Sequence, residues 1–195
     1  MNKSVIAYFL CGLATLIYVP SVAQINNEDS ASQATKELPL EPERNINFTT
    51  NEGTWISLDV SPDGEKIIFD LLGDLYMMPL KGGYATPLTS GMAYDVHPRF
   101  SPDGNSILYI SDKSGSDNVW TMDLNSKKEK QISHDKKHNF FSATWTRDSN
   151  YIVAAKGRRN AKFNIYHKEG GAGSSLFTEP KDLKTIDPAF GAEGK

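Results

Sequence analysis

The sequence predicts an all-β protein, a partial β-propeller of about three four-stranded antiparallel blades plus the first strand of a fourth. Three observations predict this fold. One turn sequence recurs every 40 to 45 residues, β-rich segments flank each copy, and the same order of strand-like segments follows each copy. The length of 195 residues, with 38% hydrophobic and 23% charged residues, is ordinary for a folded chain.

The repeated turn reads "VSPDG" at 60–64, "FSPDG" at 100–104 and "WTRDS" at 145–149, with a fainter "FGAEG" at 190–194. Proline presets the second position of a type I turn, aspartate bonds its own backbone, and glycine accepts the left-handed conformation that closes the turn. The third copy lacks both proline and glycine. Each copy nevertheless predicts a hairpin between two strands.

The expected strands follow in a fixed order. First strands are "WISLDV", "DVHPRF" and "FFSATW", and second strands are "KIIFDL", "SILYIS" and "YIVAAK". Third strands carry a carboxylate or amide, an aliphatic and an aromatic residue, at 74–76, 118–120 and 164–166, and fourth strands end at Thr89, Ser133 or Thr178. A β-sandwich is the alternative, but sandwiches lack a 40-residue repeat.

Equivalent positions in the repeat predict the core. Val60, Phe100 and Trp145 are expected to be buried, and the aromatic residues Tyr76, Trp120 and Tyr166 are expected to pack between blades. We expect no helix longer than two turns after the first segment of the chain.

Three regions are predicted along the chain: a signal peptide at 1–23, a polar linker at 24–50, and an incomplete propeller at 51–195. A lysine, a 15-residue apolar run and small residues before position 24 indicate the signal; an uncleaved anchor is the alternative, although about 20 apolar residues are needed to span a bilayer. The expected blades cover about 54–90, 91–135 and 138–180, and the next begins at 183–195. Residues 45–50 alternate enough to be a short strand.

The propeller is expected to be incomplete in this chain. Closed propellers need about four to eight blades, because closure removes unpaired strand edges. Residues 185–190 are expected to form a strand with little pairing of its own.

The "SPDG" turns followed by "DLYMM" or "NVWTMD" resemble the TolB-like and tricorn-like propeller repeats of bacterial secreted proteins, over residues 51–195. The stretch at 48–104 resembles the opening of secreted proteins in which such a propeller precedes an amidohydrolase domain. The resemblance implies a periplasmic or secreted protein whose propeller is a scaffold or substrate gate. Its catalytic domain, with a possible divalent metal, would follow Lys195 and would be a partner of the propeller.

Two other functions stay open under this resemblance. One is a TolB-like propeller that binds a protein without catalysis, and the other is the propeller of a prolyl-oligopeptidase-type or tricorn-type serine peptidase. TolB itself has an α/β domain before its propeller, which the roughly 27 residues after the predicted signal are too few to form.

The sequence predicts no catalytic, cofactor-binding or metal-binding residue in this chain. It contains no His-x-His pair, His-Glu-x-x-His helix or Gly-x-Ser-x-Gly elbow. "HDKKH" at 134–138 is expected to be an exposed loop, and "GGAGSS" at 170–175 a hairpin turn. A net charge of −3 with a pI of about 5.8 gives no footprint for nucleic acid.

Polar residues one and three positions before the equivalent core residues share a face of each first strand. We hypothesise that this face lines the entrance of the propeller channel and contacts a peptide or protein ligand, the alternative being a structural hydrogen-bonded ring. The candidate contact residues are Ser57, Asp59, His97, Arg99, Ser142 and Thr144.

Overall fold

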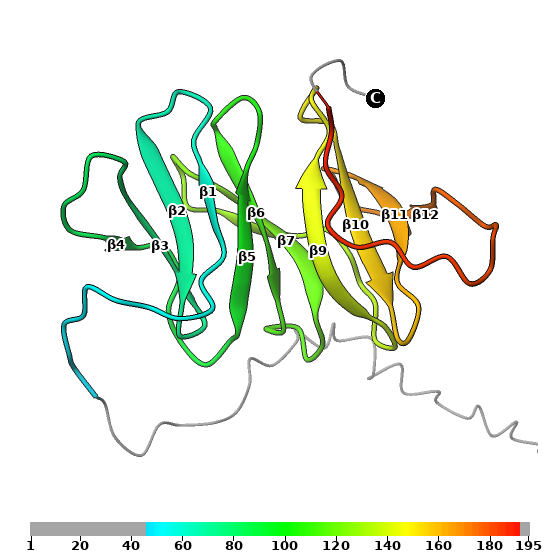
Figure 1. Cartoon of the computed structure of the whole chain (residues 1–195), viewed down its shortest axis with the longest axis horizontal. Coiled ribbons are helices and arrows are strands. Elements are labelled where there is room, and N and C mark those ends of the chain that lie inside the picture. The colour runs from blue at the N-terminus through cyan, green and yellow to red at the C-terminus, as the bar shows by residue number, and fades with distance from the viewer. Residues whose placement is uncertain (1–45, 192–195) are drawn as a thin grey trace, which may run out of the picture. The chain divides into compact units, whose positions relative to one another are not determined.

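Three four-stranded antiparallel sheets follow one another along the chain in the computed structural model, which describes residues 46–191. Each sheet pairs its strands in sequence order, which is the arrangement of a propeller blade (Figure 1). The described residues contain no helix, and therefore none that is long and apolar enough to cross a membrane. The predicted partial β-propeller is confirmed.

The strands have the following bounds. Blade 1 contains β1 (Leu58–Val60), β2 (Lys66–Leu71), β3 (Asp74–Pro79) and β4 (Thr86–Pro87). Blade 2 contains β5 (Asp95–Phe100), β6 (Ser106–Ser111), β7 (Asn118–Asp123) and β8 (Glu129–Gln131). Blade 3 contains β9 (Asn139–Trp145), β10 (Tyr151–Gly157), β11 (Lys162–His167) and β12 (Ser174–Ser175). Each fourth strand ends two or three residues before the predicted position.

All three repeated turns share one hydrogen-bond pattern. In the first, the Ser61 N–H donates to the Lys66 carbonyl at 2.9 Å and the Gly64 N–H donates to the Ser61 carbonyl at 2.8 Å. In the third, the Ser149 N–H donates to the Thr146 carbonyl at 3.0 Å, and Ser149 takes the left-handed φ of 55°. The hydroxyl and aspartate of the motif therefore form the turn even where glycine is missing.

Two apolar clusters hold the blades together. Between blades 1 and 2 the buried residues are Ile68, Leu75, Phe100, Ile107, Tyr109 and Met122. Between blades 2 and 3 they are Leu108, Ile110, Val119, Ile132, Phe140, Ala143, Trp145, Ile152, Ala154 and Tyr166. Alternate residues of β6 enter different clusters, because successive side chains of a strand point to opposite faces.

The prediction for Val60 is wrong. Phe100 and Trp145 are buried, but Val60 is 42% exposed. Phe100 packs into the cluster that blade 1 completes, and Trp145 into the cluster that blade 2 completes. The equivalent face of blade 1 has no sheet packed on it among residues 46–191, so Val60 and the half-buried Tyr76 lie on an open face.

Two predicted strands are not formed. Residues 46–50 and 183–191 are irregular, whereas we expected short strands at 45–50 and 185–190. The second segment instead lies on blade 3, where the Thr185 N–H donates to the Ala161 carbonyl at 2.9 Å. A first strand needs the second strand of its own blade for a ladder, and no such partner exists within the described range. The predicted signal peptide and most of the predicted linker lie outside that range.

Candidate functional site

The first strands of blades 1 and 2 meet around the buried carboxylate of Asp70, which comes from β2. One oxygen accepts a hydrogen bond from the Ser57 N–H at 3.0 Å, and the other accepts one from the His97 N–H at 2.9 Å. His97 lies in a β-bulge of β5 and has a φ of 56°. A bulge removes an N–H from the strand ladder, and Asp70 of the neighbouring blade satisfies this one.

Four of the six candidate contact residues come together at this junction. The Ser57 hydroxyl lies 2.8 Å from Nδ1 of His97. The Arg99 guanidinium donates to the Leu58 carbonyl at 2.8 Å, and the Asp59 carboxylate accepts from the Phe100 N–H at 2.8 Å. The His97 ring is exposed, so a hydroxyl, an imidazole and a guanidinium are available on one edge of the paired blades.

The other two candidates lie on β9 of blade 3. Ser142 is buried, and its hydroxyl accepts a hydrogen bond from the Asp187 N–H at 2.9 Å, while Thr144 is half-buried. The side chains of Ser57, Asp59 and Ser142 thus form hydrogen bonds to residues of the segment that follows their own blade in the chain. Contacts of this kind would occur in a structural hydrogen-bonded ring. Whether the six line a channel stays a prediction.

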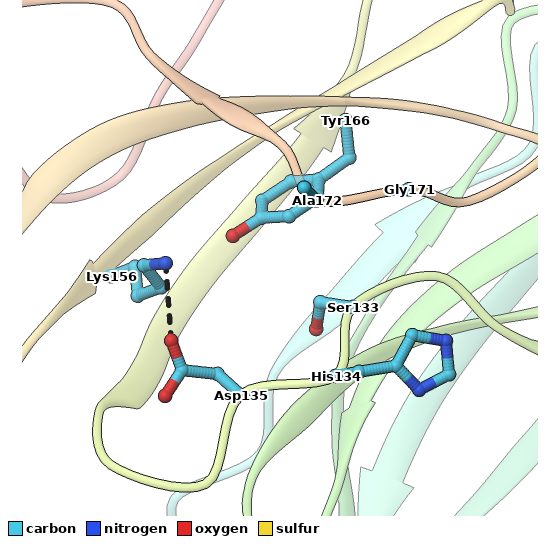
Figure 2. Close-up of a pocket in the computed structure, with 7 residues that line it drawn as sticks. All are labelled: Ser133, His134, Asp135, Lys156, Tyr166, Gly171 and Ala172. Atoms are coloured by element: carbon cyan, nitrogen blue, oxygen red, sulfur yellow. Dashed lines mark ion pairs between the residues drawn. The ribbon is translucent and has the colours of Figure 1, made fainter.

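A cavity of about 170 Å³ lies between blades 2 and 3, away from the Asp70 junction. It is lined by Ser133, His134, Asp135, Lys156, Tyr166, Gly171 and Ala172. Figure 2 shows the Lys156 ammonium and the Tyr166 hydroxyl on the blade 3 side, with the loop carrying Asp135 opposite.

An ion pair spans this cavity, with Nζ of Lys156 3.1 Å from the Asp135 carboxylate. Burial alone raises the pKa of Asp135, but hydrogen bonds from the N–H groups of Lys137 and His138 and from the Lys156 side chain lower it well below its usual range. Burial raises the pKa of Tyr166, although the nearby Lys156 cation opposes this. At neutral pH the cavity therefore holds a carboxylate, an ammonium and a protonated phenol.

The loop of residues 134–138 is fixed by side chains of blade 2. The Asn118 amide donates to the Asp135 carbonyl at 3.0 Å and accepts from the Asp135 N–H at 2.8 Å. His138 turns its Nδ1 to Asp135 at 3.1 Å. Residues 134–138 form a loop, as predicted, but Asp135 and His138 are half-buried and not exposed. Residues 168–173 connect β11 to β12, so the predicted hairpin turn at 170–175 ends in β12 (Ser174–Ser175). Residues 46–191 hold no cluster of three histidine, cysteine or acidic side chains suited to a metal.

Sequence reasoning missed Asp70 and Lys156, although a signal was present for each. Asp70 is the only acidic residue in the apolar strand "KIIFDL", and Lys156 ends the apolar run "YIVAA". A charge in such a strand indicates a specific partner, because an unpaired buried charge is costly. The partner itself, on another blade or loop, could not be read from the repeat.

The sequence matches the family described as PD40, TolB beta propeller domain, over residues 36–190. Among curated relatives, the chain is 28% identical to the Tol-Pal system protein TolB of Wolinella succinogenes over 60% of this chain and 28% of that protein. It is 28% identical to dipeptidyl-peptidase 5 of Porphyromonas gingivalis, over 56% of this chain and 19% of the peptidase. It is 30% identical to tricorn protease homolog 1 of Streptomyces coelicolor, over 37% of this chain and 7% of that protein. The chain thus spans less than a third of the length of these relatives.

Solved structures share the fold at low identity. TolB of Acinetobacter baumannii matches with a TM-score of 0.58 and 23% identity, over 75% of this chain and 37% of that one. A puromycin-hydrolyzing peptidase of Mycobacterium tuberculosis matches with a TM-score of 0.54 and 12% identity, over 67% of this chain and 23% of the peptidase. These likenesses concern the fold alone.

Proposed function

The chain belongs to the TolB beta propeller domain family, and from this premise we propose that its blades are the scaffold and substrate gate of a secreted hydrolase. In this proposal the blades select and orient a peptide or protein ligand, and a catalytic domain outside residues 46–191 performs the reaction. The observation that carries the proposal is the polar edge at the Asp70 junction, where Ser57, His97 and Arg99 gather across two blades. Such a convergence offers hydrogen bonds to the backbone or a terminus of a peptide.

Relatives support the hydrolase part of the proposal. Two of the curated proteins that share these blades are named as peptidases or proteases, and the match covers only a small share of each. A peptidase is therefore the alternative that the relatives favour, and its serine type rests on the resemblance of the repeats. The amidohydrolase class, with a divalent metal in its own domain, rests on the resemblance of residues 48–104 alone. Both proposals place the protein in the periplasm or outside the cell.

The second candidate function is a binding propeller without catalysis. The TolB protein of Wolinella succinogenes, named for the Tol-Pal system, supports it. In this case the same edge of blades 1 and 2 would contact a protein partner, and no hydrolytic activity would accompany binding.

One set of assays separates these functions. The complete translation product, purified from its host, is tested on peptide anilides and on N-acyl amides, with a chelator or with a fluorophosphonate. Inhibition by the fluorophosphonate alone indicates a serine peptidase, and inhibition by the chelator alone indicates an amidohydrolase. A protein that turns over neither substrate class contradicts the hydrolase proposal.

The gate is tested with variants of the edge. His97→Ala and Arg99→Ala should raise KM several-fold with little change of kcat, because they alter binding and not the reacting groups. Arg147→Ala, at an exposed turn of blade 3, is the matched control and should leave both constants unchanged. Equal effects of all three variants would show that the edge has no role in substrate selection.

A further inference from the structure

The cavity between blades 2 and 3 is separate from the edge assigned to the gate. We propose that it binds the carboxylate group of a small acid or of a peptide C-terminus, between Lys156 and Tyr166. Three properties of the cavity favour this ligand: the hydrogen-bonding groups that are already used, the charge and the size.

The only acidic group of the cavity has no capacity left. One oxygen of Asp135 accepts from the N–H groups of Lys137 at 2.7 Å and His138 at 2.9 Å. The other accepts from the Lys156 ammonium and the His138 ring, both at 3.1 Å. A carboxylate offers about four acceptor sites, so Asp135 is saturated and serves to fix Lys156.

The donors of the cavity keep free capacity. An ammonium has three donors, and Lys156 pairs with the Asp135 carboxylate, which leaves donor capacity for a ligand. The Tyr166 hydroxyl lines the same cavity, where its O–H can donate to a ligand. The N–H groups of Gly171 and Ala172 also have no hydrogen-bond partner within residues 46–191. A site whose one carboxylate is saturated while its donors stay free fits a ligand that accepts hydrogen bonds, such as an oxyanion.

Charge selects a carboxylate among the oxyanions. The positive charge of Lys156 is already balanced by Asp135 at 3.1 Å, so the cavity is close to neutral before a ligand enters. A monoanion adds one charge, which the free donors can stabilise. A phosphate dianion adds about twice as much beside the Asp135 carboxylate, and it is therefore disfavoured.

The cavity is rigid and large enough for such a ligand. Its volume of about 170 Å³ far exceeds the ~10–15 Å³ that a single water needs. The Tyr166 ring is held by Phe140, with ring centroids 6.0 Å apart, and by Gly173, where any Cβ would come within 2.3 Å of the ring. These contacts hold the hydroxyl toward the cavity without a ligand, which reduces the entropy that binding costs.

Binding is tested by titrating the full chain, labelled with ¹⁵N, with propionate, N-acetylalanine, propionamide and inorganic phosphate at constant ionic strength. Propionate and N-acetylalanine should saturate and shift the amide signals of residues 133–135, 156, 166, 171 and 172. Propionamide and phosphate should bind at least about ten-fold more weakly. Tighter binding of N-acetylalanine identifies a peptide terminus as the source of the carboxylate, and tighter binding of propionate identifies a small acid.

Variants assign the effect to the proposed groups. Tyr166→Phe should weaken propionate binding about ten-fold, because a hydrogen bond to a charged group is lost. Lys156→Met should remove saturable binding, while Lys136→Met, on the exposed part of the same loop, should leave it unchanged. If Lys156→Met does not fold, Ala172→Leu is the second variant. Its larger side chain should fill the cavity from the loop between β11 and β12 and should also remove binding.

Three results would overturn the proposal. These are equal binding of propionate and propionamide, shifts confined to residues away from the cavity, and a Tyr166→Phe variant that binds propionate as Lys136→Met does. None of these results bears on the peptidase and amidohydrolase assays, which do not involve this cavity.

Discussion

Strands β2 and β6 hold the same position in successive blades, yet they are buried differently. In β6 five consecutive residues are buried, because blade 1 covers one face and blade 3 covers the other. In β2 only Ile68 and Asp70 are buried, and they point toward blade 2. The local sequence therefore forms the strand, whereas the neighbouring blades decide which of its faces becomes part of the core.

The same substitution should destabilise the protein far more in β6 than in β2. Ile107 is fully buried against blade 1, and its equivalent Ile67 is only partly buried on the open face. Ile107→Ala should lower the free energy of unfolding by about 2 to 5 kcal/mol, and Ile67→Ala by under about 1 kcal/mol. Urea unfolding of the two variants measures the difference. Equal losses would mean that another part of the molecule covers the open face of blade 1.

The second prediction concerns Asp70 of β2, a buried carboxylate at a position where β6 of blade 2 has Ile110. Asp70→Ala should cost about 2 to 3 kcal/mol, because it leaves the N–H groups of Ser57 and His97 without acceptors. Urea unfolding measures the loss, and Glu65→Ala at an exposed turn is the control. A cost no greater than that of the control would show that water satisfies both groups.

The third prediction is a pH dependence at the junction of blades 2 and 3. Because the folded-state pKa of Asp135 is lowered, its ionised form adds stability that is complete above about pH 4 and is lost as the pH falls through the folded pKa. The stability advantage of the wild type over Asp135→Asn should therefore shrink below about pH 4. The difference between the urea midpoints of the two proteins at several pH values measures this advantage. The turn aspartates, whose pKa values are also lowered, are present in both proteins and therefore cancel in the difference. A gap independent of pH would contradict the pairing.

The smallest effect concerns the third turn. Ser149 adopts a φ of 55°, where the equivalent Gly104 has 72°, and a residue with a Cβ is disfavoured there. Ser149→Gly should stabilise the protein by about 0.5 kcal/mol, and Gly104→Ser should destabilise it by about 1 kcal/mol. Thermal unfolding of both variants checks the opposite signs. A destabilised Ser149→Gly variant would indicate that the Ser149 side chain contributes contacts that outweigh its backbone strain.

The polar contacts show where sequence reasoning stopped. The two-residue period predicts Ser57 and Asp59 on one face, and both side chains bond residues of blade 2. It failed to predict the bulge at His97, although Pro98, which cannot donate to a ladder, was a signal for it. It also missed the contact of Lys156 with Asp135, because the loop carrying Asp135 is positioned by Asn118 of another strand.

The fold class, the three turns and the second strand of each blade follow from the sequence alone. These features depend on residues near one another in the chain: a hydroxyl and an aspartate that bond the backbone within five residues, and apolar residues in a β-rich run. Only the tertiary structure decided that Val60 stays exposed, that Asp70 joins two blades and that Lys156 and Tyr166 share a cavity. The burial and pairing of these groups depend on which sheet packs against each face of a blade. The repeat gives every blade the same sequence pattern, so it does not show which residues of the neighbouring blade contact that face.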